Sequence, residues 1–178
     1  ISLYGASKLS AEGYISAYCG TFGFQAWVFR FANIIGRRGT HGVLVDFLAK
    51  LSTDPTRLEV LGDGSQAKSY LLVDACVDAI LFAVEHACEP FNVFNLGVED
   101  QISVSRIAAI VLEEAGLSSA RIEYTGGDRG WKGDVRKMML STRRIRELGW
   151  AVETSSEDAV RGAVRHLIGE GYLRIPGA

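Results

Sequence analysis

Apolar residues recur along the chain in two patterns, short runs typical of buried strands and longer stretches with the spacing of an amphipathic helix. The short runs predict strands at residues 24–33, 57–62, 67–73, 91–97 and 121–125. The helical spacing predicts helices at residues 7–18, 42–53, 75–87, 103–116, 142–148 and 155–169. We expect Gly20 and Gly23 to end the first helix and Asp74 to cap the third. Strands that alternate with helices in this way indicate an α/β fold.

Composition narrows the classes of function. The chain has 178 residues, of which 48% are hydrophobic and 22% charged, and its formal net charge is −2. It therefore has no overall positive field to hold a nucleic acid or an anionic membrane. Cys19, Cys76 and Cys88 show no paired spacing, so we expect reduced thiols, no disulfide framework and no metal site. No stretch resembles a secretory signal or a membrane span, so we expect a cytoplasmic protein.

A tyrosine and a lysine stand one helical turn apart in the stretch Tyr4-Gly5-Ala6-Ser7-Lys8. On a helix, side chains at i and i+4 lie on one face, so the ammonium of Lys8 can favour the ionised form of the phenol of Tyr4. A phenol ordinarily loses its proton near pH ~10, so a tyrosine that acts as a general acid or base near neutrality needs such a neighbour. The spacing alone is also common on any helix face, where it has no chemical role.

Further motifs follow this pair in order. They read "YGASKLSAE", "VFRFANIIGRRG", "LEVLGDGSQAKSYLLVDACVDAI", "FNVFNLG" and "GDVRKMMLSTRRIRELGW". With these stretches the chain resembles the C-terminal half of the extended short-chain dehydrogenase/reductase family, and especially its nucleotide-sugar epimerases. The resemblance covers nearly the whole chain, and several ordered motifs are far more specific than any one of them.

The resemblance implies the C-terminal part of a Rossmann-type doubly wound sheet plus a small α/β substrate-binding lobe. It assigns residues 1–41 and 74–100 to the Rossmann domain, and residues 42–73 and 101–178 to the substrate lobe. In that family a glycine-rich turn after the first strand binds the dinucleotide, and the sequence G-x-G-x-x-G does not occur in these 178 residues. We therefore expect a fragment that lacks the N-terminal NAD-binding half and is inactive alone.

The chemistry that the resemblance implies is a transient oxidation of a sugar with bound NAD. Tyr4 would take the proton of a sugar hydroxyl while NAD takes a hydride from the same carbon, and the resulting keto-sugar would rotate before the hydride returns. Lys8 would hydrogen-bond the nicotinamide ribose, and Phe31 would contact the cofactor. The implied reaction is the epimerisation of a nucleotide sugar, of the kind that interconverts UDP-glucose and UDP-galactose.

Three residues match positions that bind the substrate in the family. Asn33 matches an asparagine directly, although an asparagine after a strand also commonly closes a turn. Lys68 stands where the family usually has arginine, so it keeps the charge and loses the bidentate geometry; a solvated lysine on an edge strand is the common alternative. Tyr70 follows two residues later in the same motif.

The stretch from residue 126 to residue 138 holds three more candidates for substrate binding. Arg129 would reach the diphosphate from a rearranged loop, because Trp131 occupies the position where family members often have arginine. Asp134 would accept hydrogen bonds from the nucleotide ribose, or it caps a turn. Met138 matches a position that lines the sugar pocket, where a flexible methionine is otherwise core filler.

Two classes of function remain open. The first is an NAD-dependent enzyme, either an epimerase or a nucleotide-sugar 4,6-dehydratase or decarboxylase of the same superfamily. The second is a non-catalytic module that keeps a nucleotide-sugar cleft or a dimer surface without turnover. The resemblance also implies a homodimer in which the helix that carries Tyr4 and Lys8 packs against its copy.

Overall fold

The structure, a computed structural model, describes residues 2–127, 130 and 135–175. Its helices are α1 (Leu3–Phe22), α2 (Val43–Thr53), α3 (Val73–His86), α4 (Val104–Glu114), α5 (Arg143–Leu148) and α6 (Ser156–Gly169). Its strands are β1 (Ala26–Phe31), β2 (Asn33–Ile35), β3 (Arg57–Val60), β4 (Ala67–Lys68), β5 (Tyr70–Leu72), β6 (Phe91–Leu96), β7 (Ile102–Ser103), β8 (Arg121–Tyr124) and β9 (Lys137–Met138). The predicted α/β fold is confirmed.

Parallel pairing joins most of the strands. β1 pairs with β6 along its whole length, from Ala26 opposite Phe91 to Phe31 opposite Leu96. β2 pairs with β5, and β3 pairs with β8, also in parallel. In a three-stranded sheet, β4 is antiparallel to β7 and parallel to β9. Parallel strands need crossover connections, and the helices between them give the layered arrangement of a Rossmann-type fold.

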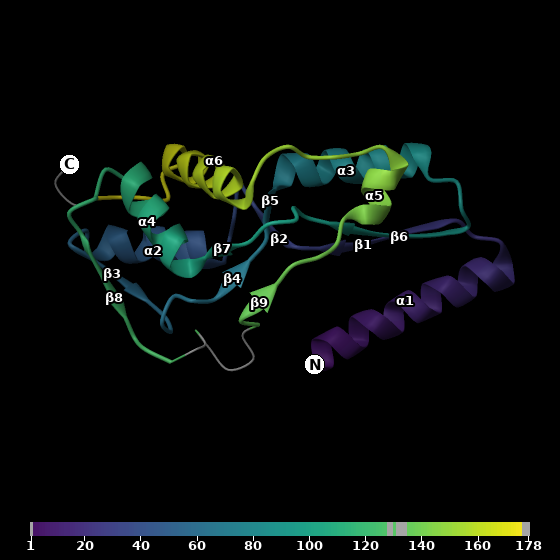
Figure 1. The fold of residues 1–178 in the computed structure, drawn as a ribbon, viewed down its shortest axis with the longest axis horizontal. Coiled ribbons are helices and arrows are strands. Elements are labelled where there is room, and N and C mark those ends of the chain that lie inside the picture. Colours follow the sequence, from purple (N-terminus) through teal and green to yellow (C-terminus); the bar gives the residue numbers. More distant parts are fainter. Residues whose placement is uncertain (1, 128–129, 131–134, 176–178) are drawn as a thin grey trace.

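Two clusters of buried side chains hold these elements together. One includes Leu48 and Leu51 of α2, together with side chains of β3, α4 and α6. The other includes Leu71 of β5 and Ile145 of α5, together with side chains of α3 and β6. Figure 1 shows α2, α4 and α6 toward one end of an elongated molecule, and α1, α3 and α5 toward the other. The division of the sequence into a Rossmann domain and a substrate lobe stays a prediction.

Ser69, between β4 and β5, is fully buried and joins several strands. Its hydroxyl donates to the carbonyl oxygen of Val98 (2.7 Å) and accepts from the backbone N–H of the same residue (3.3 Å). Its carbonyl oxygen accepts from the backbone N–H (3.2 Å) and the side-chain amide (3.0 Å) of Asn33. Its backbone N–H donates to the carbonyl oxygen of Met138 (3.2 Å). One residue therefore links the β4–β5 segment to β2, to the chain after β6 and to β9.

The first helix is longer than the sequence predicts. It begins at Leu3 because the Ser2 hydroxyl accepts a hydrogen bond from the backbone N–H of Gly5 (3.0 Å) and caps the helix there. Gly20 does not end it, because a single helical glycine costs only about 1 kcal/mol and the flanking turns continue. Gly23 does end it, with φ = 70° at the C-cap.

Three other predictions about local structure are wrong. Asp74 does not cap α3: the helix begins at Val73, Leu72 occupies the cap position, and Asp74 lies in the first turn, where its carboxylate faces the positive end of the helix dipole. The predicted strand at residues 67–73 is divided at Ser69 into β4 and β5, which have different partners. The predicted strand at residues 24–33 likewise divides at Ala32 into β1 and β2.

Arginine and glutamate side chains link α4 to α6. Arg161 binds Glu113 (2.7 Å), Glu114 (3.0 Å) and Glu157 (3.2 Å), and Arg106 binds Glu157 (2.6 Å). The hydrogen bond from Arg161 lowers the pKa of Glu113, and the one from Arg106 lowers the pKa of Glu157. Exposed ion pairs contribute little to stability, so this network mainly fixes how the two helices lie against each other.

Among the described residues, no helix has the length and apolar character needed to cross a bilayer.

We expect Ser69→Ala to lower the free energy of unfolding by about 1–3 kcal/mol, because it leaves the buried N–H and carbonyl of Val98 without their partner. Urea denaturation measures the change. The control is Ser10→Ala, since the Ser10 hydroxyl makes an exposed bond to the carbonyl of Ala6 within α1, and its loss should change stability by less than about 0.5 kcal/mol. Equal effects of the two substitutions would contradict the role of Ser69.

Candidate active site

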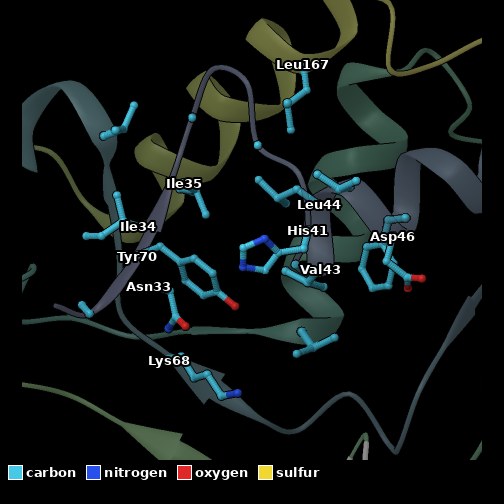
Figure 2. A pocket seen from close by; sticks show the side chains of 18 of the residues that line it. Asn33, Ile34, Ile35, His41, Val43, Leu44, Asp46, Lys68, Tyr70 and Leu167 are labelled. Carbon is cyan, nitrogen blue, oxygen red and sulfur yellow. The ribbon is translucent and has the colours of Figure 1, made fainter. Parts of the chain in front are cut away.

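A cavity of about 870 Å³ lies over the carboxyl end of β2, the loop that follows it and the first turns of α2 (Figure 2). Asn33 of β2, Lys68 of β4 and Tyr70 of β5 line it, and so does Tyr4 of α1. Its volume suits a ligand of several hundred daltons. Open α/β sheets bind ligands outside the carboxyl ends of their strands, and the lining includes Ala32 and Asn33, which directly follow the carboxyl end of β1.

The tyrosine and lysine of the opening motif come together on α1. The Nζ atom of Lys8 lies 5.4 Å from the centroid of the Tyr4 ring. Residues 23–25 turn the chain from α1 into β1, so α1 runs back along the strand (Figure 1) and its first turn lies toward the carboxyl end of β1. Tyr4 is 72% exposed and is part of the cavity lining. An acid/base side chain therefore has access to a ligand in this cavity.

Asn33, Lys68 and Tyr70 come from three different strands and meet on one side of the cavity (Figure 2). Asn33 is the first residue of β2, and its amide donates to Ser69, so it does not close a turn. Lys68 lies opposite Ile102 of β7 and Met138 of β9, so its strand is central in the three-stranded sheet and not at an edge. The two alternative roles considered for Asn33 and Lys68 therefore do not apply.

Two further candidates, Phe31 and Met138, lie outside the cavity lining. Phe31, the last residue of β1, is exposed and stacks on Phe29 with ring centroids 6.5 Å apart. Met138 is half-buried in β9 beside Lys68, and neither it nor Phe31 belongs to the cavity lining within the described part of the chain. Arg129 and Asp134 lie outside the described residues.

Sequence reasoning missed several polar residues of the lining, among them His41 and Gln66. The Nδ1 atom of His41 lies 3.1 Å from the hydroxyl of Thr40. Gln66 is buried; its Nε2 makes a long contact of 3.5 Å with the carbonyl of Leu61, and its Oε1 has no hydrogen-bond partner among the residues that the structure describes. His41 stands in a glycine-rich loop shortly after the asparagine motif, which is the signal that would have indicated it.

The loop from residue 36 to residue 42 forms the wall that carries His41. Gly36 has φ = 148°, and a Cβ atom there would lie 2.7 Å from Cγ1 of Val73, so only glycine fits without a shift. Arg38 has φ = 58°, and its backbone N–H donates to the carboxylate of Glu170 (2.9 Å) just after α6. The loop is therefore held against both α3 and the end of α6.

Metal-ligand side chains do not gather here: in the described ranges, no group of three or more His, Cys, Asp or Glu residues is placed to hold a metal ion. The chemistry available to the cavity is instead that of a phenol, an amide, an ammonium and an imidazole. Proton transfer and anion binding are the tasks these groups perform.

A Rossmann-type sheet with a Tyr-x-x-x-Lys helix beside a cavity at its strand ends defines a protein of the short-chain dehydrogenase/reductase type. The chain belongs to the NAD dependent epimerase/dehydratase family, whose model matches residues 1–97. This membership confirms the resemblance found in the sequence motifs.

Known proteins similar to the chain include epimerases and dehydratases of nucleotide sugars. GDP-mannose 3,5-epimerase 1 of Oryza sativa subsp. indica is 31% identical over 166 residues, which are 89% of this chain and 42% of the relative. The dTDP-glucose 4,6-dehydratase of Streptomyces griseus is 31% identical over 163 residues, 92% of this chain and 49% of the relative. The crystal structure of UDP-glucose 4-epimerase with UDP-glucose from Thermotoga maritima superimposes with a TM-score of 0.81 at 30% identity, covering 96% of this chain and 54% of that one.

The chain spans about half the length of the curated relatives it matches. Both kinds of reaction, epimerisation and dehydration, occur in the names of these relatives. Membership of the family is therefore established at the level of nucleotide-sugar epimerases and dehydratases.

The loop geometry predicts different effects of alanine at its two ends. Gly36→Ala should destabilise the protein by about 1–3 kcal/mol more than Gly42→Ala, because both glycines have positive φ but only Gly36 would drive its new Cβ into Val73. At Gly42 nothing lies within 4 Å of the added atom. Thermal unfolding of the two variants measures the difference, and equal midpoints would show that the contact with Val73 yields at little cost.

Proposed function

We propose that the protein, in its complete form, is an NAD-dependent nucleotide-sugar epimerase of the UDP-glucose 4-epimerase type. The observation that carries the proposal is that Tyr4, beside Lys8, shares one cavity with Asn33 and Lys68. A nucleotide sugar needs a proton-transfer group at its sugar and cationic or amide donors at its diphosphate. The UDP-glucose in the Thermotoga maritima structure supports a UDP-sugar as the ligand.

The lining of the cavity suggests how such a ligand lies. Tyr4 comes from α1, Asn33 and Lys68 from β2 and β4, and the apolar side chains of Phe47 and Val104 from α2 and α4. We place the sugar at Tyr4 and the diphosphate at Asn33 and Lys68. The nucleoside then lies against the apolar lining, where the stacking faces of a base can be buried.

NAD would be bound by three side chains, those of Tyr4, Lys8 and Phe31. All three side chains are exposed, and the course of α1 along β1 brings the start of the helix toward the strand end where Phe31 stands. Dinucleotides bind outside the carboxyl ends of the strands in folds of this type. NAD supplies a hydride acceptor when bound. Lys8 would bind its ribose hydroxyls and keep a positive charge beside the phenol.

Tyr4 would move the proton. Its phenol oxygen would take the proton of the sugar hydroxyl that is oxidised, and would return a proton to the same oxygen after the keto-sugar has rotated. Asn33 and Lys68 would hold the diphosphate during this rotation, so that the sugar turns while the nucleotide stays bound. One side chain thus acts in turn as base and acid.

Three alternatives give outcomes that differ from those of an epimerase. A nucleotide-sugar 4,6-dehydratase is favoured by the relative from Streptomyces griseus, which is as similar to the chain as the epimerase from rice. It would use the same tyrosine and would need a further acid and base for the loss of water. The other two alternatives are a decarboxylase of the same superfamily and a non-catalytic nucleotide-sugar-binding module. Neither would form UDP-galactose from UDP-glucose.

Tyr4→Phe should reduce turnover by at least about 10²-fold with little change in nucleotide-sugar affinity, because only the proton-transfer group is lost from an exposed position. The assay follows the interconversion of UDP-glucose and UDP-galactose by the full-length gene product with NAD, with chromatography of all products to detect a keto-deoxy sugar. A Tyr4→Phe protein that works at the parent rate would remove Tyr4 from the mechanism.

Lys68→Ala is the matched contrast, since it removes a group that shares the cavity but not the proton transfer. A diphosphate contact that is equally strong in the ground state and the transition state raises KM more than it lowers kcat. The reverse pattern, a lower kcat at unchanged KM, would place Lys68 at the reacting sugar.

We also propose a homodimer formed through α1. Among the residues of α1, all of which the structure describes, Cys19 is the one that is buried. Tyr14 is 71% and Phe22 63% exposed, and Tyr18 packs on Phe22 with ring centroids 5.2 Å apart. Large exposed apolar patches mark surfaces that another chain or segment covers.

Sedimentation of the full-length gene product tests this assembly. We expect a dimer at micromolar concentration and a shift toward monomer in Tyr14→Lys, because a charge would enter the apolar contact. Leu81→Lys is the control, since Leu81 is 62% exposed on α3, a different helix. A parent protein that sediments only as a monomer would contradict the proposal.

A further inference from the structure

His41 is the one histidine that lines the cavity within the described part of the chain. It directly precedes Gly42, the N-cap residue of α2. Figure 2 shows its imidazole ring between the phenol ring of Tyr70 and the start of α2, with Asn33 and Lys68 on the side of Tyr70. The ring is therefore placed to contact whatever occupies the cavity.

The two ring nitrogens of His41 have different surroundings. Nδ1 lies 3.1 Å from the hydroxyl of Thr40, the preceding residue, and the ring makes no other hydrogen bond with the residues described. When the threonine hydroxyl donates to Nδ1, the proton of the neutral ring is on Nε2. Nε2 is then the donor offered to a ligand, and a protonated ring offers the same donor with a full charge.

The charged groups around His41 favour an anion. Asp46 of α2 forms an ion pair with Lys50 (2.9 Å), and Glu170, which follows α6, accepts from the backbone N–H of Arg38 in the loop. Lys68 of β4 and Arg37 of the loop line the same cavity.

On the side of α6, Arg37 lies 3.4 Å from Nε2 of His166, so the His166 ring faces the loop and not the ligand. The carboxylates near the cavity thus already have cationic or N–H partners, and the lining also holds two cationic side chains, Lys68 and Arg37. A diphosphate, which has only acceptor atoms and two negative charges, matches this wall.

We infer that His41 is a specificity-determining contact, whose Nε2 donates to the diphosphate of the nucleotide sugar and binds it more tightly when the ring is protonated. The inference rests on the proposed function of the cavity. It adds a pH-dependent contact from the loop wall to the contacts from Asn33 and Lys68 on the strand wall.

Calorimetry with UDP-glucose at pH about 5.5 and about 8 tests the inference on the full-length gene product. The titration uses UDP-glucose and not free UDP, because the terminal phosphate of UDP itself titrates near pH ~6 and would add a pH dependence of its own. We expect the parent to bind about five- to twentyfold more tightly at the lower pH, as a charge-assisted hydrogen bond replaces a neutral one. His41→Gln keeps a neutral donor and should lose this pH dependence.

His86→Gln is the matched control, because His86 is exposed on α3, stacks on Phe82 and is not part of the cavity lining. It should keep the pH dependence of the parent. Uridine, which lacks the diphosphate, should bind the parent and His41→Gln equally at both pH values. A His41→Gln protein with the pH dependence of the parent would overturn the inference and leave the proposed function standing. Failure of the parent to bind UDP-glucose at either pH would overturn the proposed function and the inference with it.

A second measurement needs no substitution. The chain has three histidines, and nuclear magnetic resonance can follow the titration of each ring. If UDP-glucose binds the protonated form of His41 more tightly, linkage requires the ligand to raise the titration midpoint of that ring by the same factor. The midpoint of His86 should not move. An unchanged midpoint for His41 in the presence of saturating UDP-glucose would overturn the inference.

Discussion

The wall of the cavity depends on the hydrogen bonds of one buried serine. Ser69 separates Lys68 from Tyr70, and its hydroxyl, carbonyl and N–H reach Val98, Asn33 and Met138 respectively. Because these partners belong to β2, β9 and the chain after β6, the serine fixes the β4–β5 segment relative to all three. Lys68 and Tyr70 lie on either side of it, so their places in the cavity are set by the same bonds.

The surroundings of Ser69 are equally restricted. A Cβ atom at Gly97 would lie 2.9 Å from the Cβ of Ala32 and 3.5 Å from the Ser69 hydroxyl, so the chain after β6 packs closely against the junction of β1 and β2 and leaves no room for a side chain. The backbone N–H of Tyr70 donates to the hydroxyl of Ser156 (3.0 Å), which ties the same strand to the start of α6. The strand wall of the cavity is therefore fixed from several directions, while the opposite wall is a loop.

The sequence predicted the elements well wherever periodicity decides them. The α/β alternation and the helices α4 and α6 follow from patterns within the chain. Asn33, Lys68 and Tyr70 were selected instead through the family resemblance, and the structure brings them to one cavity. The break at Ser69 could not be predicted, since the change of strand partners that separates β4 from β5 leaves no mark in the short-range pattern.

Residues in loops and at helix starts were harder to place. Asp74 has the chemistry of a cap, but the helix begins one residue earlier, where β5 ends and leaves no room for a separate cap. His41 follows no periodic pattern, so its place in the cavity depends on the path of a loop that glycines at residues 36 and 42 direct. The hydrophobic periodicities of strands and helices, 2 and 3.6 residues, contain no information about the path of a loop.

The position of Tyr4 relative to the strand wall has a different basis. α1 buries only Cys19 and is tied to β1 by a short turn and by the ion pair of Glu12 with Arg30, whose hydrogen bond lowers the pKa of Glu12. An exposed ion pair contributes little, and an isolated helix is marginally stable in water. The exposed apolar side chains of α1, such as Tyr14 and Phe22, are where the proposed dimer would hold the helix and, with it, Tyr4. Since proton transfer needs a fixed distance between the phenol and the sugar, assembly and activity should be coupled through this helix.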